Sequence, residues 1–334
     1  MTDKIAIVGG SIAGLITALN IRRSLVDIFE EHSTIGLPFK CSGLINAELF
    51  EQLDIGRNTI QSKLCGSVIV SPSDKIIKFD TGRNIGYVVN RPIFENEIVK
   101  RLGNNVKIYN PKKIKSIQEL KNYRLIVGAD GAFSLVRRSF NFPSLHYTFG
   151  VQYEISYPQK WPDYVTLFID KNYSDYHIWN IPVGKEKSRV GLAARSVGEG
   201  FQLLNKFILE KFGRCEVAGK MWGAVPVGYV EKITGNKVAL VGDAAGQNRP
   251  LSGGRLNLAI KYGNLLGKAI EENELRRYQK AWKVEDLQKI KKELRMLEKW
   301  KSLSNQQIDQ IIENLPKPDF KDSTLFTAVF RSII

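Results

Sequence analysis

A short loop of small residues near the start of the chain has the spacing of a phosphate-binding turn. It follows the apolar run Ile5–Val8 and reads Gly-Gly-Ser-Ile-Ala-Gly over Gly9–Gly14, a Gly-x-Ser-x-x-Gly pattern. A dinucleotide pyrophosphate needs a turn with little side-chain bulk, so that backbone N–H groups and a helix N-terminus face its negative charge. We therefore predict contacts to such a group from a set of small residues: Gly9, Gly10, Ser11, Ala13 and Gly14.

Two carboxylates follow this loop at the distance expected for ribose recognition. Glu30 and Glu31 come after a second apolar run, and Glu30 is 21 residues after Gly9, the first residue of the loop. Of the two, we favour Glu30 as the acceptor for an adenosine ribose, because it ends the run. The alternative interpretation is an ordinary strand–helix turn followed by a solvated acidic pair.

Two further motifs occur in order along the chain, GADGAFSLVRR at 128–138 and VGDAAG at 241–246. Together with the first loop, they resemble the FAD-dependent oxidoreductases related to para-hydroxybenzoate hydroxylase. The resemblance implies FAD as cofactor, with Gly242 and Asp243 at the ribitol chain and with Asp130 and Gly131 near the cofactor. It also matches Arg91 to a family arginine. The alternatives are that Asp130 caps a turn and that Arg91 is a surface charge.

A narrower resemblance lies in residues 35–44, IGLPFKCSGL. This segment is similar to the cysteine-glycine segment of the geranylgeranyl reductase family, whose members saturate isoprenoid chains. The resemblance implies that Cys41 and Ser42 face the cofactor. The alternative is a buried small residue at a turn.

An aromatic stretch supplies candidates for a substrate cavity. The sequence YHIWNIP at 176–182 resembles the Tyr-x-Trp-x-Phe-Pro motif of the same reductases, with Trp179 and Pro182 matching. Its Trp-Asn-Ile-Pro part is also similar to a motif of flavin halogenases. Such a strand lines an apolar cavity beside a flavin or belongs to an ordinary core. The cavity residues that we predict are Tyr176, His177, Trp179, Ile181, Pro182 and Pro250.

The largest departure from the family pattern is the segment RPLSGGRL at 249–256. The family has Gly-x-Gly at a helix start whose backbone approaches the flavin, which implies cofactor contacts from Gly253, Gly254, Arg255 and Leu256. Arg255 occupies the second glycine position. Its side chain points away, places a cation by the flavin, or narrows the site.

The resemblance implies reduction of carbon–carbon double bonds in a prenyl lipid or isoprenoid by hydride transfer from reduced flavin. Cys41 and His177 are the candidates for the proton donor. One glycine loop of this kind is visible, so electrons arrive from transiently bound NAD(P)H or from a carrier protein. The alternatives are a flavin-dependent monooxygenase or halogenase, and a protein that binds flavin or lipid without catalysis.

These motifs require an α/β fold. Buried apolar runs beside helical periodicity indicate parallel strands, whereas residues 147–194 alternate and indicate an antiparallel sheet. We predict a Rossmann-like, doubly wound FAD-binding domain formed by residues 1–60, 84–143 and 235–275. An antiparallel β-sheet substrate domain, formed by 61–83 and 144–234, is intercalated in it, and a helical C-terminal region covers 276–334.

Composition narrows the class of protein. The chain has 334 residues and a formal charge of +15, which favours anionic partners. No nucleic-acid-binding signature accompanies the charge, and three cysteines and three histidines lack metal-ligand spacing, so we expect neither nucleic acid nor a metal.

The chain also carries features that bear on membranes. No apolar run reaches membrane-spanning length. The run Ile5–Val8 begins so close to the start of the sequence that it leaves no room for a signal peptide before it, so we expect a cytoplasmic protein. Residues 275–301 form an amphipathic basic segment. This segment lies peripherally on an anionic membrane surface or packs on the protein with its basic face in water.

Overall fold

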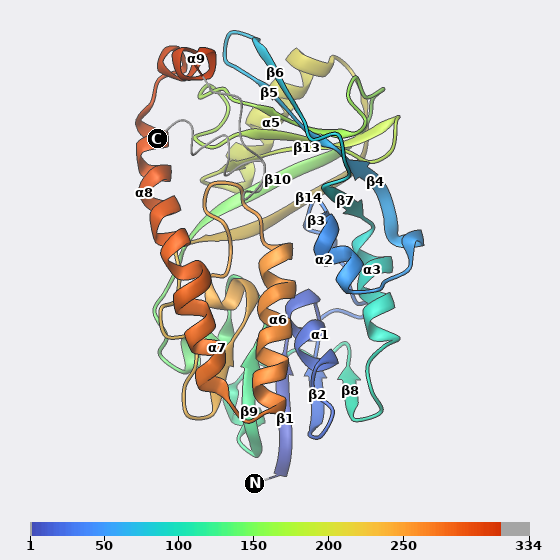
Figure 1. The fold of residues 1–334 in the computed structure, drawn as a ribbon, viewed down its shortest axis with the longest axis vertical. Helices are drawn as coiled ribbons and strands as arrows, with labels where there is room; N and C mark the ends of the chain where they lie inside the picture. The colour runs from blue at the N-terminus through green and yellow to red at the C-terminus, as the bar shows by residue number, and fades with distance from the viewer. Residues whose placement is uncertain (1, 315–334) are drawn as a thin grey trace. The chain divides into compact units, whose positions relative to one another are not determined.

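The computed structural model describes residues 2–314, and the chain folds into two compact units (Figure 1). The first unit comprises the chain up to Phe39 together with Arg91–Tyr147 and Val225–Lys292. The second comprises Lys40–Asn90, Thr148–Ala224 and the described residues from Glu293 to Asn314. Residues 40–60 and 84–90, which the sequence analysis assigned to the FAD-binding domain, cluster with the second unit. Residues 315–334 of the predicted helical C-terminal region lie outside the described residues.

The first unit is built on a parallel sheet with the strand order β15-β9-β1-β2-β8. The strands are β1 (Thr2–Val8), β2 (Leu25–Phe29), β8 (Val106–Tyr109), β9 (Tyr123–Gly128) and β15 (Val238–Leu240). The chain proceeds outward from β1 through β2 to β8 and then returns to the other side of β1. In such sheets, ligands bind beyond the carboxyl ends of the strands where the strand order reverses. That position is the end of β1 and β9.

The helices of this unit are α1 (Ile12–Leu19), α3 (Arg91–Val99), α4 (Leu135–Ser139), α6 (Leu256–Glu271) and α7 (Leu275–Ala281). Short helical turns occur at Ile117–Leu120, Gly242–Ala245 and, as a π-helix, Trp282–Leu287. Helix α6 packs closely on α1 at Gly267, which has no side chain. A Cβ there would lie 2.4 Å from the Thr17 carbonyl oxygen. These packed helices fix the N-terminal ends that surround the first loop.

The second unit contains a seven-stranded sheet with the order β14-β10-β13-β12-β11-β5-β6. Its strands are β5 (Gly66–Val70), β6 (Ile76–Asp80), β10 (His146–Ser156), β11 (Tyr164–Phe168), β12 (Ile178–Pro182), β13 (Lys187–Ala194) and β14 (Glu216–Val227). The predicted antiparallel sheet is present. However, β5 pairs with β11 in parallel, because the long connection between them forms a crossover. Helix α5 (Val197–Phe212) covers one face through Leu204 and Phe207.

A smaller sheet in the same unit has the order β3-β7-β4. Its strands are β3 (Leu44–Asn46), β4 (Ile60–Leu64) and β7 (Gly86–Val89), and α2 (Ala47–Gln52) and a turn at Arg57–Thr59 lie between β3 and β4 along the chain. The sequence analysis did not identify β3, α2 or β8. Strands of three or four residues are too short to show the alternation on which a prediction rests.

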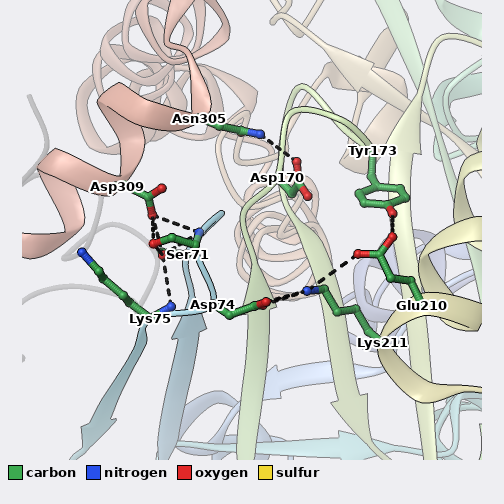
Figure 2. Close-up of polar contacts among 10 residues, drawn as sticks. Ser71, Asp74, Lys75, Asp170, Tyr173, Glu210, Lys211, Asn305 and Asp309 are labelled. Atoms are coloured by element: carbon green, nitrogen blue, oxygen red, sulfur yellow. Dashed lines mark hydrogen bonds and ion pairs between the residues drawn. The ribbon is translucent and has the colours of Figure 1, made fainter.

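Helices α8 (Gln288–Ser302) and α9 (Asn305–Glu313) end the described chain. Figure 2 shows how α9 is held in the second unit: Asp309 accepts hydrogen bonds from the Ser71 hydroxyl at 2.5 Å and from the Ser73 hydroxyl at 2.8 Å. At the start of α9, the Asn305 amide donates to Asp170 at 2.9 Å. Polar side chains therefore anchor the start and the middle of this helix.

The amphipathic segment packs as a protein helix. In α8 the apolar side chains of Ile290, Leu297 and Trp300 are buried, while Arg295 and Lys299 are exposed. Of the two interpretations of residues 275–301, the apolar face of α8 matches the packed one. Within residues 2–314, no helix combines the length and the apolar character that a membrane span requires.

Candidate functional site

The glycine loop leaves no space for side chains where it passes the sheet. Gly9 follows β1 with φ of +106°, and a Cβ there would lie 2.2 Å from the carbonyl oxygen of Ala129. A Cβ at Gly14 would lie 2.0 Å from the Gly9 carbonyl oxygen. The Gly9 N–H donates to the Phe29 carbonyl at 2.9 Å, so the loop is fixed against the end of β2. The sequence needs glycine at both positions to make this turn.

The structure distinguishes the two carboxylates that follow β2. Glu30 is buried, and its Oε2 accepts a hydrogen bond from the Gly10 N–H at 2.8 Å. Its Oε1 accepts from the His32 N–H at 2.9 Å and contacts His32 Nδ1 at 2.6 Å. Glu31 instead pairs with Lys113 at 2.5 Å on the surface. Glu30 therefore lies against the loop, as the ribose interpretation requires, and His32 is a partner that the sequence analysis did not identify.

Arg91 is not a surface charge. At the start of α3, its Nε donates to Glu95 Oε1 at 2.9 Å, and its terminal nitrogen contacts Ser11 Oγ at 3.2 Å. The Ser11 hydroxyl also donates to Glu95 Oε1 at 3.2 Å. Glu95 is 1% exposed. Ser11, which replaces the usual middle glycine, therefore hydrogen-bonds to both partners of the Arg91–Glu95 ion pair. The motifs did not reveal the Glu95 carboxylate.

The second motif is organised by Asp130 and Arg137. Asp130 accepts from the Ser134 hydroxyl and from the Val136 N–H, so it caps α4, and burial raises the pKa of its carboxyl. This is the alternative interpretation of Asp130, and its cofactor role stays a prediction. Gly131 has φ of +75° with open space around it.

Arg137 joins the second motif to the third. Its guanidinium is buried and donates to the carbonyl oxygens of Ala132 at 2.7 Å and Ala244 at 3.1 Å. It also donates to the Tyr147 hydroxyl at 2.5 Å. Although Arg137 belongs to the second motif, its contact with Ala244 spans segments far apart in the sequence and gave no local signal.

Asp243 and Arg255 form an ion pair. Arg255 precedes the first residue of α6, and its NH1 lies 2.9 Å from Asp243 Oδ2. The Arg255 side chain therefore does not point away from this motif. Its guanidinium contacts the aspartate that the resemblance assigns to the ribitol. Gly242 brings this motif to the first loop, because a Cβ there would lie 2.9 Å from the Ala13 Cβ.

The remaining predicted residues of the third region form a tight loop before α6. The Gly253 N–H donates to the Arg249 carbonyl at 2.8 Å, and the Arg249 N–H donates to the Gly254 carbonyl at 3.1 Å. Pro250 lies within this loop, and Leu256 is buried at the first turn of α6. The first unit thus gathers the three motifs at the ends of β1, β9 and β15, with Glu30 at the end of β2.

These residues fit FAD. The loop leads into the N-terminus of α1, where the N-cap residue Ser11 makes no side-chain cap hydrogen bond, so the first backbone N–H groups of the helix can bind a pyrophosphate. Arg91 supplies a nearby cation. Glu30 and Asp243 supply the two acceptors needed for a ribose and a ribitol. Among the described residues, no cluster of three or more histidine, cysteine or acidic side chains is suited to a metal ion.

The Cys41–Gly43 turn of the cysteine-glycine segment lies in the second unit. Gly43 has φ of +82°, and a Cβ there would lie 2.4 Å from the Val89 carbonyl oxygen, so the turn presses against β7. The Gly43 N–H donates to Cys41 Sγ at 3.4 Å, and the Ser42 carbonyl accepts from Arg189 at 2.8 Å. Cys41 is partly exposed. Its predicted approach to the cofactor stays a prediction.

The aromatic strand begins at Ile178, two residues later than predicted, so Tyr176 and His177 precede β12. Trp179 lies opposite Gly191 of β13, and its indole N–H donates to Gln152 Oε1 at 3.1 Å. Residues alternate across a strand, so Trp179 and Ile181 face away from the α5 core that Ile178 joins. Pro182 ends the strand.

Of the two residues before β12, His177 is buried and Tyr176 is partly buried. Burial lowers the pKa of His177 to about 4, so the imidazole is neutral near pH 7 and is a weak proton donor. Burial also raises the pKa of Tyr176, whose carbonyl accepts from the Trp300 indole at 3.3 Å. Because His177 is neutral near pH 7, Cys41 is the favoured one of the two candidates for the proton donor.

Known proteins resemble this chain over most of its length. No family model matches the chain. An uncharacterized protein of Methanocaldococcus jannaschii is 31% identical over 350 residues, covering 95% of this chain and 89% of the relative. A digeranylgeranylglycerophospholipid reductase of Methanosarcina acetivorans is 26% identical over 368 residues, covering 96% of this chain and 90% of the relative.

Solved structures share the fold across the whole chain. A geranylgeranyl bacteriochlorophyll reductase-like protein from Thermoplasma acidophilum superposes with a TM-score of 0.85 at 21% identity, covering 100% of this chain and 95% of that one. A p-nitrophenol 4-monooxygenase from Pseudomonas putida gives 0.73 at 16% identity, covering 99% and 98%. The predicted fold class is confirmed. With its ordered motifs and these relatives, the chain belongs to the geranylgeranyl reductase family of FAD-dependent oxidoreductases.

Proposed function

We propose that this protein is an FAD-dependent reductase that saturates carbon–carbon double bonds of a geranylgeranylated glycerophospholipid. The observation that carries the proposal is the relationship over nearly the whole chain to archaeal proteins named digeranylgeranylglycerophospholipid reductase. The three assembled motifs support the same conclusion, because they provide the acceptors and the loop that FAD requires.

The residues of the first unit divide the task of holding the cofactor. The loop Gly9–Gly14 and Arg91 would hold the pyrophosphate, Glu30 the ribose, and Asp243 with Arg255 the ribitol. When bound and reduced, FAD supplies a hydride for an alkene carbon. The protein must hold the alkene in reach and exclude water while a proton reaches the neighbouring carbon.

The second unit supplies the candidates for the substrate side. Trp179 and Ile181 form an apolar part of one sheet face, which suits a prenyl chain. The Cys41 thiol is the favoured candidate for the proton donor, since His177 is buried and neutral. Electrons would come from transiently bound NAD(P)H or from a carrier protein, because the sequence contains one glycine loop of this kind.

Product analysis tests the proposal. The FAD-loaded protein is reduced with dithionite without oxygen, incubated with a digeranylgeranyl glycerophospholipid, and the lipid is analysed by mass spectrometry. We expect a gain of two hydrogen atoms for each saturated double bond. An unchanged lipid would refute the reductase. An oxygenated product on admitting air would favour the monooxygenase, whose fold this chain shares with the p-nitrophenol 4-monooxygenase.

We also propose that the protein meets its lipid at an anionic membrane surface. The formal charge of +15 attracts negatively charged headgroups, and this attraction weakens as salt screens it. Co-sedimentation should therefore show binding to vesicles of anionic phospholipid, release at high salt, and little binding to vesicles of neutral phospholipid. Equal binding to both vesicle types would contradict the proposal.

A further inference from the structure

A buried cation lies under the cysteine-glycine turn of the second unit. Arg189 of β13 is 3% exposed. Its guanidinium reaches three segments: Nε lies 3.1 Å from Glu154 Oε2 on β10, NH2 donates to Gln61 Oε1 on β4 at 2.9 Å, and NH1 donates to the Ser42 carbonyl at 2.8 Å. This one side chain connects the seven-stranded sheet to the three-stranded sheet and to the turn.

Stability alone does not explain such an arrangement. Burying an arginine removes it from water, and desolvation lowers the pKa of Arg189. Replacing a buried ion pair with apolar residues of similar volume is often neutral or stabilising. A planar guanidinium does, however, fix several acceptors in defined directions, which a hydrophobic side chain does not do. What Arg189 adds is a fixed position for its acceptors.

The acceptor with chemical interest is the backbone carbonyl of Ser42. It lies between Cys41 and Gly43, and the turn at Gly43 is already packed against β7, with the Val89 N–H donating to the Gly43 carbonyl at 2.9 Å. Arg189 holds the turn from the other sheet. Because hydrogen bonds hold the turn on two sides, Cys41 and Ser42 keep one orientation.

The same sheet face carries the aromatic strand. Arg189 lies opposite Ile181 and Glu154, and the next cross-strand row along β13 on this face is Trp179, Gly191 and Gln152. A Cβ at Gly191 would lie 2.5 Å from Trp179 Cζ2, so the indole lies directly over the β13 backbone. Trp179 and Arg189, which holds the turn, are therefore neighbours on this face.

We propose that Arg189 is a positioning residue that holds the Cys41–Gly43 turn beside Trp179, so that the turn and the aromatic strand form one wall facing the substrate. The proposal rests on the proposed function only where it assigns this wall to the substrate. The juxtaposition itself is a property of the second unit and does not depend on turnover.

A fluorescent probe on Cys41 tests the juxtaposition directly. In a Cys65→Ser, Cys215→Ser background, monobromobimane labels Cys41 alone, and tryptophan quenches bimane only at short range. The Trp179→Phe variant gives the unquenched reference. We expect the Trp179-dependent quenching to fall at least threefold in Arg189→Met, with a rise in the rotational mobility of the probe.

Two variants separate positioning from general destabilisation. Arg189→Lys keeps the charge but loses the fork of donors, so we expect it to restore only part of the quenching. Arg195→Met removes an exposed arginine one residue beyond the end of β13 and should leave the quenching unchanged. FAD affinity should stay within twofold in Arg195→Met.

The outcomes are distinct. A folded Arg189→Met protein with quenching and mobility like the parent would overturn the proposal. Where that variant fails to fold, Glu154→Gln, which weakens the ion pair that holds the guanidinium, must lower quenching in the same direction, and no change there would overturn it. Because the measurement uses no lipid, a failed reductase assay with altered quenching would refute the proposed function and leave the positioning role supported.

Discussion

Charged side chains at the candidate site and in the second unit are held by partners that lie either nearby or far away in the sequence. Glu30 was identifiable because it ends an apolar run after a glycine loop, which is a local pattern. Glu95, Arg137 and Arg189 were not, because their partners Ser11, Ala244 and Ser42 lie far away in the sequence. A buried charge is recognised through the contacts that stabilise it, and those contacts exist only after folding.

The first prediction contrasts two adjacent carboxylates. Glu30→Gln removes the charge from the proposed ribose acceptor while preserving its shape. Losing a hydrogen bond to a charged group costs about 1.5–3 kcal/mol, or roughly 10- to 100-fold in affinity. Titration of apoprotein with FAD, followed by flavin fluorescence, should show this loss. Glu31→Gln is the matched control, since Glu31 pairs with Lys113 at the surface, and comparable losses in both variants would contradict the assignment.

The second prediction concerns the arginine that replaces a family glycine. Arg255 neutralises Asp243, and positive charge near a flavin favours its reduced, more negatively charged form. Arg255→Gly should therefore lower the reduction potential of bound FAD, measured by equilibration with a reference dye. Arg277→Gly, which removes an exposed arginine from α7, is the control. A potential that Arg255→Gly leaves unchanged would show that the charge does not reach the flavin.

Whole elements were predictable where they are long or strongly patterned. The run Ile5–Val8 is buried on a central parallel strand, and residues 147–194 form the expected antiparallel strands. Elements of three to six residues, such as β3 and α2, depend on their neighbours for stability and carry little pattern of their own. The parallel pairing of β5 with β11 was also hidden, because strand order depends on how a long connection returns.

Helix α9 provides a pH-dependent prediction at this scale. Although burial opposes it, hydrogen bonds from Ser71 and Ser73 hold the pKa of Asp309 below its ordinary value. A carboxyl with a depressed pKa stabilises the folded state above its unfolded pKa, near 3.9, and this contribution disappears as the pH falls through the lower folded value. The protection factors of the α9 amides, which are the exchange rates corrected for the intrinsic effect of pH, should therefore fall on acidification below about pH 4.

The matched variant for this helix is Asp309→Asn. Its side chain does not titrate, so the protection factors of the α9 amides should be lower than in the parent at neutral pH and should not fall further on acidification. The control is Asp74→Asn, an exposed partner of Lys211 in the same region (Figure 2). An acid response that survives in Asp309→Asn would assign the effect to another group.

At the scale of the whole molecule, the order of the motifs predicted more than any one of them. Three glycine-containing segments separated by more than a hundred residues assemble at the ends of β1, β9 and β15. That assembly follows from a parallel sheet whose strands all end at one edge. The grouping of residues 40–60 with the second unit was not predictable, because it depends on strand pairing in β3-β7-β4 rather than on a motif.

The central claim is that this protein transfers reducing equivalents from its flavin to a prenyl double bond. The most direct measurement is anaerobic stopped-flow absorption of the dithionite-reduced, FAD-loaded protein mixed with a digeranylgeranyl glycerophospholipid. The account predicts return of the oxidised flavin spectrum, with one flavin oxidised for each double bond saturated. A flavin that stays reduced with this lipid, yet is rapidly reoxidised by air, would contradict it.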